Sequence, residues 1–452
     1  MKLVATILAA AVLLPGQQSP AADEMNIAQA VEGALRNYPS IRVTEEQMNA
    51  AAAGIRLART AYLPRIDGLA QVNRATRNTF YGLLLPQGVI PGVDGVKADK
   101  FGTVFDSGVG ILVSWQPFDF GLRHANVAAA EALHDQTRAA LNKTRYEISV
   151  AAADAFLTVI AARQTVEATR VAVESWQTLQ RSIHALVNAQ LRPGADESRV
   201  AAEMAMAQTQ MAQAEQAVDV ARAVLREFVG AESTLNTAKL LDPAPDSTEA
   251  PFDAARNPLA KEQTAAIAQQ QKRLDALSRT YYPQFLVQGV ASGRGTGLET
   301  DGSRLGGANG LAPTVPNLGV GFTVTFSAMD RFAIREQQAM QAANLRAQEA
   351  QYQTVAAKLR AQYDTAVAAL VGAHRVAAST PVAVSSARTA VAQATARYQS
   401  GLAPIDDVAQ ARRLLVQAEI DDALAHLNVW RARLQVAAAR GDIQPFLNEA
   451  VR

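Results

Sequence analysis

The most informative absence from this 452-residue chain is cysteine, which does not occur at all. Without cysteine there can be no thiol catalysis, no thiolate metal site and no disulfide. The acylated N-terminal cysteine of a bacterial lipoprotein is excluded as well. The chain therefore forms none of these sulfur-based sites.

Neither sign of charge dominates, because 43 lysines and arginines stand against 42 aspartates and glutamates. Charged residues make up 19% of the chain, below the roughly 25% of a typical globular domain. This balance provides no basic surface for nucleic acid and no acidic tail that would imitate it. We therefore expect no nucleic-acid partner.

Motifs of catalysis and cofactor binding are also missing. The chain has no Gly-x-Ser-x-Gly, no phosphate-binding Gly-Lys-Ser/Thr and no dinucleotide fingerprint. Its five histidines show no metal-ligand spacing. We expect no catalytic residue, no cofactor and no metal, and hence no enzyme.

One extended apolar run stands at the N-terminus. Lys2 supplies a positive start, residues 3–14 are apolar, and small residues lead to Ala21 and Ala22. This order is typical of an export signal over residues 1–22. The run is shorter than the about 20 residues of a membrane-spanning helix, and we find no second run of that length. We expect an exported protein that enters a membrane, if at all, through β-strands.

An internal duplication organises the rest of the chain. Pro39 and Pro258 lie 219 residues apart, and so do Pro64 and Pro283. Later landmarks are separated by 211 residues: Trp115 and Phe326, Asp119 and Asp330, Leu191 and Leu402, Pro193 and Pro404, Asp196 and Asp407. The difference falls between the predicted strands, where loops absorb changes of length more easily than packed helices do.

The first repeat, residues 23–230, begins with an alanine-rich helical stretch that stops at Pro64. Strands are predicted at about 65–73 and 108–118, followed by a long helical hairpin over 121–230. From Gly121 to Leu191 no proline or further glycine interrupts the chain. Such a helix of about 70 residues would be roughly 105 Å long and has to pack along neighbouring helices.

The second repeat, residues 257–441, has the same order of elements. Its strands are predicted at about 284–292 and 317–327 and its hairpin at 331–441. Pro381 predicts a local bend in the long helix. Residues 231–256 are predicted to link the repeats, and residues 442–452 to form a C-terminal tail.

The strands carry the membrane prediction. Val109, Ile111, Val113 and Trp115 alternate with small or polar residues, and the strand at 317–327 repeats this pattern. A barrel strand between lipid and an aqueous lumen requires this alternation, although a soluble sandwich strand shows it too. Four strands cannot enclose a lumen, since the smallest membrane barrels use about eight. An export signal and too few strands together predict an oligomeric barrel.

With these features in order, the chain resembles the outer-membrane efflux (TolC) family along nearly its whole mature length. The motifs that carry the resemblance are Asn37-Tyr38-Pro39 with Asn257-Pro258, Tyr62-Leu63-Pro64, the strand exit 115–121, and Arg397-Tyr398-Gln399-Ser400-Gly401-Leu402 with Asp406-Asp407-Val408. One departure is the second strand exit, residues 326–332, which lacks the glycine of the first and leaves the bend into the helix less defined.

The resemblance implies a mixed α and β fold, mainly α. Three copies of the four strands would form a twelve-stranded outer-membrane β-barrel that continues into a long periplasmic α-helical barrel. The homotrimer would contact outer-membrane lipid, a periplasmic adaptor protein and an inner-membrane pump. It would be the passive exit duct of a tripartite efflux or type I secretion system of a Gram-negative bacterium, gated at its periplasmic tip.

The same resemblance assigns roles to the two turns between the long helices. The gate would involve Asp196, Asp407, Asp406 and Arg192, and the adaptor would contact Leu191, Pro193, Gly401 and Leu402. Three copies of each aspartate would form a carboxylate ring that repels itself when closed and attracts cations. These aspartates would equally suit a first helical turn, where negative charge is favoured by the helix dipole. Both interpretations stay open.

Three aromatic residues, Trp115, Phe118 and Phe326, are assigned to the membrane interface, with core packing as the alternative. The apolar stretch 80–93 would cover the barrel mouth or contact a neighbouring subunit. Two other kinds of protein also fit an exported, helix-rich chain. A periplasmic coiled-coil adaptor without a pore would not need paired alternating strands, and an exported enzyme would need a pocket of convergent titratable groups.

Overall fold

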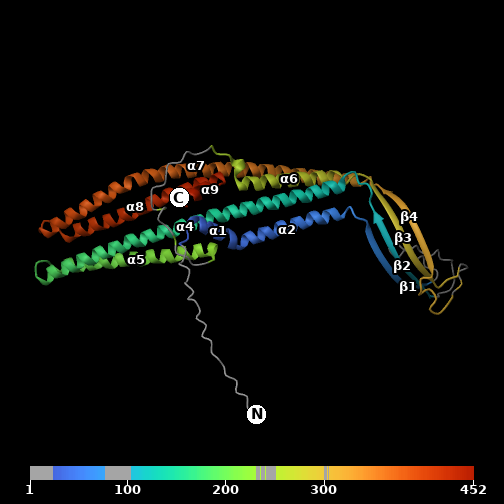
Figure 1. Cartoon of the computed structure of the whole chain (residues 1–452), viewed down its shortest axis with the longest axis horizontal. Coiled ribbons are helices and arrows are strands. Elements are labelled where there is room, and N and C mark those ends of the chain that lie inside the picture. Colours follow the sequence, from blue (N-terminus) through green and yellow to red (C-terminus); the bar gives the residue numbers. More distant parts are fainter. Residues whose placement is uncertain are drawn as a thin grey trace, which may run out of the picture. The chain divides into compact units, whose positions relative to one another are not determined.

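The computed structural model describes residues 24–76, 103–230, 235, 240, 251–299, 303 and 305–451. The predicted export signal, the apolar stretch 80–93 and most of the predicted linker lie outside the described residues. The described part has a mixed fold that is mainly helical, as predicted (Figure 1).

Long helices dominate both repeats. The first repeat contains α1 (Ile27–Asn37), α2 (Pro39–Thr60), α4 (Leu122–Asn188) and α5 (Gly194–Val229). The second contains α6 (Pro258–Ser278), α7 (Asp330–Gln399), α8 (Ile405–Arg440) and α9 (Gln444–Val451), preceded by a short 3-10 turn, η2 (Ala254–Arg256). Helix α9 occupies the segment that we predicted as a C-terminal tail. The sequence predicted one helical stretch before Pro64, whereas the structure has two helices there, α1 and α2.

Four strands complete the elements: β1 (Arg65–Thr76), β2 (Thr103–Trp115), β3 (Gln284–Thr296) and β4 (Val315–Thr325). All four extend further than predicted at the end away from the helices, because loop-like sequence there still pairs. Strand β2 ends earlier than predicted, two residues before Pro117, which lacks the backbone donor that a ladder needs.

The chain divides into two compact units, which we describe separately. Unit 1 comprises Met1–Arg42, Lys143–Pro258 and Ala356–Arg452, and unit 2 comprises Val43–Asn142 and Leu259–Val355. Each unit draws on both repeats, and helices α2, α4 and α7 run through both units.

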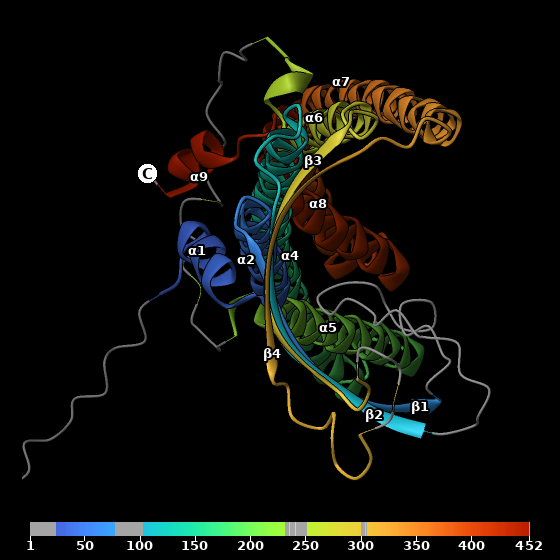
Figure 2. The ribbon, with the colours of Figure 1, turned by 90° about the vertical axis from the view of Figure 1, so that its right-hand side faces the viewer.

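In unit 1, the helices pack around a core centred on Phe156 of α4 and Trp430 of α8, both completely buried. Helices α1 and α9 cover this core (Figure 2). Phe446 of α9 places its ring edge-on to Trp430 at 6.1 Å, and Arg433 forms an ion pair with Glu449. The C-terminal segment is helical because this docking buries its apolar face.

Unit 2 contains a four-stranded antiparallel sheet in the order β1-β2-β3-β4 (Figure 1). Its register places Ile66 opposite Val113, Val113 opposite Gly289, and Gly289 opposite Val320. Because successive side chains point to opposite faces, all four residues lie on one face of the sheet. We call it the apolar face.

The apolar face is exposed. Leu318 and Val320 are 85% and 84% exposed. The other large exposed side chains on this face are Ile66, Val72, Val109, Ile111, Val113, Trp115, Phe322 and Val324. The opposite face carries mostly polar or small residues, among them Arg65, Asp67, Gln71, Ser114, Gln288 and Asn317. A register slip of one residue would exchange the two faces, so the pattern fixes the pairing.

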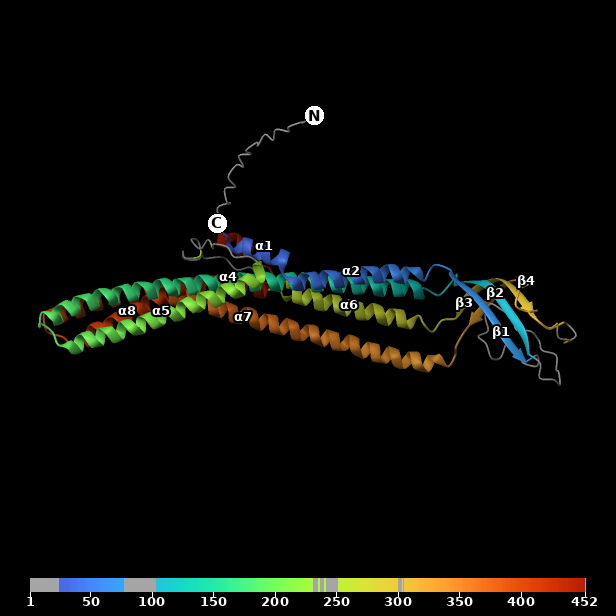
Figure 3. The same cartoon turned by 90° about the horizontal axis from the view of Figure 1, so that it is seen from below.

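Helix α7 corrects one expectation from the sequence. It contains an 18-residue window with a mean hydropathy of 1.4, which by length and composition alone is apolar enough to cross a membrane. The prediction that no second stretch of that length exists was wrong, because alanine and valine raise the average without forming an unbroken run of large apolar residues. The helix also continues through Pro381 to Gln399 (Figure 3).

The repeat-equivalent glycines Gly230 and Gly441 end α5 and α8 in left-handed conformations, with φ of 78° and 85°. A Cβ at Gly230 would meet only Asn37 Nδ2, at 3.9 Å, whereas a Cβ at Gly441 would lie 2.5 Å from the Asn257 Cα. We expect Gly230→Ala to cost about 1–2 kcal/mol through backbone strain alone. Gly441→Ala should cost about 3 kcal/mol or more, because Asn257 must also move.

Thermal unfolding of the detergent-solubilised protein checks this prediction, with Gly230→Ala as the matched control. Displacing Asn257 removes its hydrogen bond to the Ala439 carbonyl, which measures 3.1 Å. Equal losses of stability in the two variants would contradict the close packing at Gly441.

Candidate functional site

The turns between the long helices have the same backbone geometry in both repeats. Gln190 and Gly401, which are 211 residues apart, adopt left-handed conformations with φ of 56° and 76°. The amide of Leu191 donates to the Leu186 carbonyl at 2.9 Å, and that of Leu402 donates to the Arg397 carbonyl at 2.8 Å. These six-residue closures are those of a Schellman motif, which satisfies the last carbonyls of a helix.

Pro193 and Pro404 precede the helices that follow these turns. Both are N-cap residues with extended backbone and no side-chain hydrogen bond to the helix. Their carbonyls accept from the amides of Asp196 at 3.1 Å and Asp407 at 3.3 Å. Each aspartate therefore lies in the first turn of its helix, where its charge meets the positive end of the helix dipole. This location agrees with the structural interpretation of the aspartates.

Leu191 and Leu402 project from the two turns. They are 70% and 72% exposed, although a hydrophobic residue in this position of a Schellman motif usually packs back on its helix. Each turn thus presents one apolar side chain to solvent. An apolar side chain held on a tightly closed turn suits a contact with another protein.

Asp196 also contacts the other repeat. The hydroxyl of Tyr398, from the end of α7, donates to Asp196 Oδ2 at 2.6 Å. The Arg192 guanidinium lies 4.3 Å from the centre of the Tyr398 ring and donates to the Tyr398 carbonyl. Tyr398 is only 2% exposed. These three residues form a latch, which we call the Tyr398 latch, between the α4–α5 turn and the end of α7.

The phenol of Tyr398 stays protonated in this position. Burial raises the pKa of Tyr398 to about 12, the hydrogen bond and charge of Asp196 add to the rise, and the Arg192 charge opposes it. The hydroxyl therefore remains a donor to the carboxylate at neutral pH. A hydrogen bond with one charged partner contributes about 1.5–3 kcal/mol.

Asp406 takes part in a second set of charges. Its carboxylate lies 3.1 Å from Arg199 Nε of α5, and Arg199 lies 3.7 Å from the nearly buried Glu203. Glu203 is also 3.6 Å from Arg413 of α8. The chain of charges joins α5 to α8. Asp407 is exposed, and within the part of the chain that the structure describes its side chain has no hydrogen bond or ion pair.

The structure therefore divides the four predicted gate residues. Asp196 and Arg192 come together around Tyr398, Asp406 pairs with Arg199, and Asp407 stands apart. The sequence did not single out Tyr398, although it lies within the motif that carried the resemblance. Arg199 and Glu203 had no distinguishing signal, because their pairing depends on how α5 and α8 pack.

An additional contact closes the first turn only. His184 Nδ1 lies 2.6 Å from Glu197 Oε1, and His184 Nε2 lies 3.0 Å from Asn188 Nδ2. The equivalent positions of the second repeat hold Thr395 and Val408, which cannot form such a pair. The two turns share a backbone but differ in side-chain contacts.

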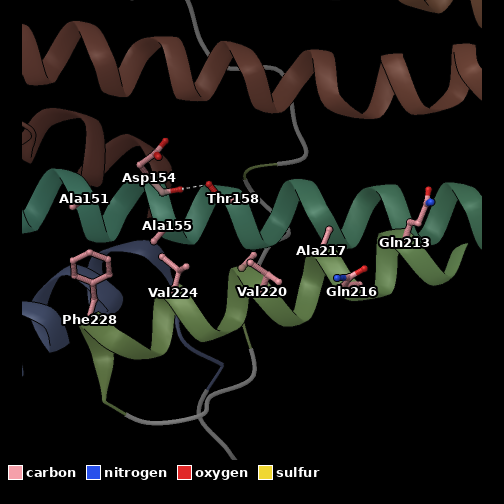
Figure 4. A pocket seen from close by; sticks show the side chains of 11 residues that line it. Ala151, Asp154, Ala155, Thr158, Gln213, Gln216, Ala217, Val220, Val224 and Phe228 are labelled. Atoms are coloured by element: carbon pink, nitrogen blue, oxygen red, sulfur yellow. Dashed lines mark hydrogen bonds between the residues drawn. The ribbon is translucent and has the colours of Figure 1, made fainter. Parts of the chain in front are cut away.

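An apolar groove lies beside α4 and α5, away from the turns. Its volume is about 600 Å³, and Val220, Val224 and Phe228 of α5 line it together with Ala155 and Thr158 of α4 (Figure 4). No cluster of titratable groups converges on it. Among the described residues, no three or more histidines, aspartates or glutamates are grouped to hold a metal ion.

The predicted interface aromatics gather in unit 2 where the strands meet the helices. Trp115 Nε1 donates to the Tyr62 carbonyl at 3.2 Å, Phe118 lies 4.6 Å from the ring of Phe120, and Phe326 lies 5.4 Å from Tyr281. Trp115, Phe118 and Phe326 are all about half exposed. They pack on neighbouring rings and also present apolar surface.

The two strand exits differ as their sequences do. In the first repeat Phe120 and Gly121 have φ of 52° and 82°, and α4 begins after them. The second repeat has no left-handed residue at this point in the described chain, and the amide of Asp330 donates to the Ser327 carbonyl at 3.1 Å. A simple turn thus replaces the glycine bend.

Comparison with known proteins supports one class. Residues 30–231 match the model of a family described as outer membrane efflux protein. No curated protein matches the sequence. Solved structures do match. CusC has a TM-score of 0.77 and 12% identity, and the match covers 92% of each chain. CmeC of Campylobacter jejuni has a TM-score of 0.73 and 14% identity, covering 93% of this chain and 86% of CmeC, and VceC of Vibrio cholerae has a TM-score of 0.72 and 16% identity, covering 92% of this chain and 96% of VceC.

The fold is thus that of an outer-membrane channel subunit, with a four-stranded sheet and long helical hairpins. The chain matches the outer membrane efflux protein family over residues 30–231 and shares the channel fold over nearly its whole length. It is a subunit of an outer-membrane efflux channel that extends into the periplasm.

Alkaline titration tests the latch. Because the pKa of Tyr398 lies above the 10.0 of an unfolded tyrosine, the stability from this shift is complete below pH 10 and is lost as the pH rises through about 12. Tyr398→Phe should remove a tyrosinate absorbance step near pH 12, and Asp196→Asn should move that step to lower pH. A Tyr398 step near pH 10, the position of an unshifted tyrosine, in the difference between the wild-type and Tyr398→Phe spectra would contradict the latch.

Proposed function

We propose that three copies of the chain form a passive exit duct whose periplasmic entrance is held closed by the Tyr398 latch. A periplasmic adaptor protein would bind the helical turns and release the latch, and an inner-membrane pump would supply the energy. The sheet of unit 2 supports the barrel, and the contacts around Tyr398 support the gate.

The sheet edges support assembly. Strand β1 and strand β4 each have one edge that pairs with no strand in the described chain. In a membrane, unpaired backbone groups cost several kcal/mol each, so spanning strands have to close into a barrel. Three four-stranded sheets would give twelve strands, with the apolar face toward lipid and the polar face toward the lumen.

The strand lengths agree with this placement. Strand β4 has 11 residues, and all of them pair with β3. A tilted strand of about 9–11 residues crosses a bilayer. The half-exposed aromatic residues then lie at the periplasmic end of the strands, as an interfacial belt requires.

The latch supports gating because it joins the two hairpins of one chain. Tyr398 ends α7, whereas Arg192 and Asp196 belong to the α4–α5 turn. Moving the α7–α8 hairpin away from the α4–α5 hairpin requires this hydrogen bond to break. The exposed Leu191 and Leu402 lie beside it in sequence, so an adaptor that binds them could bias the latch.

The proposal depends most on the four-stranded sheet, which has two unpaired edges and one exposed apolar face. Membrane fractionation tests whether this sheet is part of an outer-membrane barrel. We would express the chain, separate inner from outer membranes, and size the detergent extract before and after boiling. A heat-labile trimer in the outer membrane is the expected result. A soluble periplasmic monomer would instead favour the coiled-coil adaptor.

Single-channel conductance tests the gate. Tyr398→Phe removes the hydrogen bond to Asp196, worth about 1.5–3 kcal/mol, so the open fraction at low voltage should rise about tenfold or more. Asp196→Asn should act in the same direction. Asp407→Asn is the matched control, because it removes the equivalent charge of the other turn without breaking a contact.

If the carboxylate ring alone controlled ion flow through the entrance, Asp407→Asn would change conductance as much as Asp196→Asn. That result, combined with an unchanged Tyr398→Phe channel, would reject the latch as the gate. The trimer itself would still be established by fractionation, so the two parts of the proposal fail separately.

A further inference from the structure

The segment between β3 and β4, residues 305–313, folds back over the sheet in unit 2. We call it the strap. A Cβ at Gly293 would lie 3.3 Å from Pro313 Cβ, and a Cβ at Gly297 would lie 2.9 Å from the Asn309 carbonyl oxygen. A Cβ at Gly295 would collide with the Ala312 carbonyl. The strap therefore rests directly on the backbone of β3.

Alternating glycines determine which face the strap covers. Gly293 and Gly295 pair with Val109 and Ser107 of β2, so they belong to the apolar face. Gly310 of the strap, with φ of 95°, approaches the Phe105 carbonyl closely. Any side chain at these glycines would hold the strap away from the sheet, so the approach depends on their absence.

A cavity of about 240 Å³ lies beside the strap. Ala70 and Val72 of β1 and Val109 of β2 form its floor, and Leu311 and Pro313 of the strap form its wall. Val72, Val109 and Leu311 are exposed. The cavity is thus an apolar recess on the face of the sheet that meets lipid in the proposed barrel, at the end of the strands away from the helices.

A positive charge stands next to the recess. Arg74 is two residues beyond Val72 on β1, and it pairs with Phe105, so it belongs to the same face. Its guanidinium lies 5.1 Å from the centre of the Phe105 ring, and its Nε donates to Thr103 Oγ1 at 3.1 Å. Arg74 is exposed, and within the described residues no carboxylate forms an ion pair with it.

We propose that this recess binds an anionic lipid of the outer leaflet, with an acyl chain beside the strap and the charged headgroup at Arg74. The inference rests on the proposed function, because the apolar face meets lipid only in an inserted barrel. The order of groups along the face carries the argument. Apolar residues occupy the middle of the strands and the recess, and Arg74, the one cation on this face of the four described strands, follows at the end where headgroups begin.

An anionic lipid fits better than a neutral one because of this charge. A basic residue near the membrane surface contributes about 1 kcal/mol toward an anionic lipid, which is about fivefold in affinity. The Phe105 ring holds the guanidinium in place by a cation–π contact. A free anion would use Arg74 alone and would gain nothing from the apolar recess.

Native mass spectrometry of the delipidated trimer tests the proposal. The probes are phosphatidylglycerol, phosphatidylcholine with the same acyl chains, and glycerol phosphate without chains. The wild type should bind phosphatidylglycerol about fivefold more tightly than phosphatidylcholine, and Arg74→Gln should abolish that preference. Ala70→Phe, which fills the recess, should weaken binding of both lipids. Arg65→Gln is the matched control, since Arg65 lies on the opposite face of the same strand.

Three results would overturn the proposal: equal affinity of the wild-type trimer for the two lipids, an unchanged preference in Arg74→Gln, or glycerol phosphate binding as tightly as phosphatidylglycerol. The last would identify a site for a free anion. Only variants that form the heat-labile trimer enter the assay, so a failure of barrel assembly appears at fractionation and is distinct from a failure of lipid binding.

Discussion

Backbone hydrogen bonding at the edges of the sheet constrains everything else in this protein. A sheet of four strands with two unpaired edges and an exposed apolar face cannot reside alone in lipid, because its polar backbone groups would lack partners. Closure by further copies removes the edges and also separates the two faces into a lipid side and an aqueous side. The alternation along β2 and β4 then has a physical purpose, since each strand must suit both environments.

The two helical turns share one backbone conformation but make different side-chain contacts. Gln190 and Gly401 adopt the same left-handed conformation, and the hydrogen bonds that close the two turns are equivalent. Their side chains differ: one turn contributes Arg192 and Asp196, and the other repeat contributes Tyr398. A duplicated chain can thus hold its own two hairpins together through a contact that neither repeat could make with an identical copy.

The strap and the Tyr398 latch illustrate two different routes from sequence to contact. The strap is possible because glycines at alternate positions of β3 leave its backbone uncovered. The latch needs a buried tyrosine whose pKa is raised by burial and by Asp196, so that its hydroxyl remains a donor. In both cases a local sequence feature matters only when a distant segment is brought against it.

The sequence by itself determined the order of elements, the repeat, the strand faces and the positions of the long helices, because periodicity and the placement of proline and glycine act locally. It also indicated the turns at Asp196 and Asp407 as a site. Only the tertiary structure decided that Asp196 meets Tyr398 while the Asp407 side chain has no partner among the described residues. It also decided that Glu203 is buried between two arginines and that the C-terminal segment is a docked helix. These features depend on which helix faces pack together, and side-chain pairing across such interfaces leaves no periodic trace in the chain.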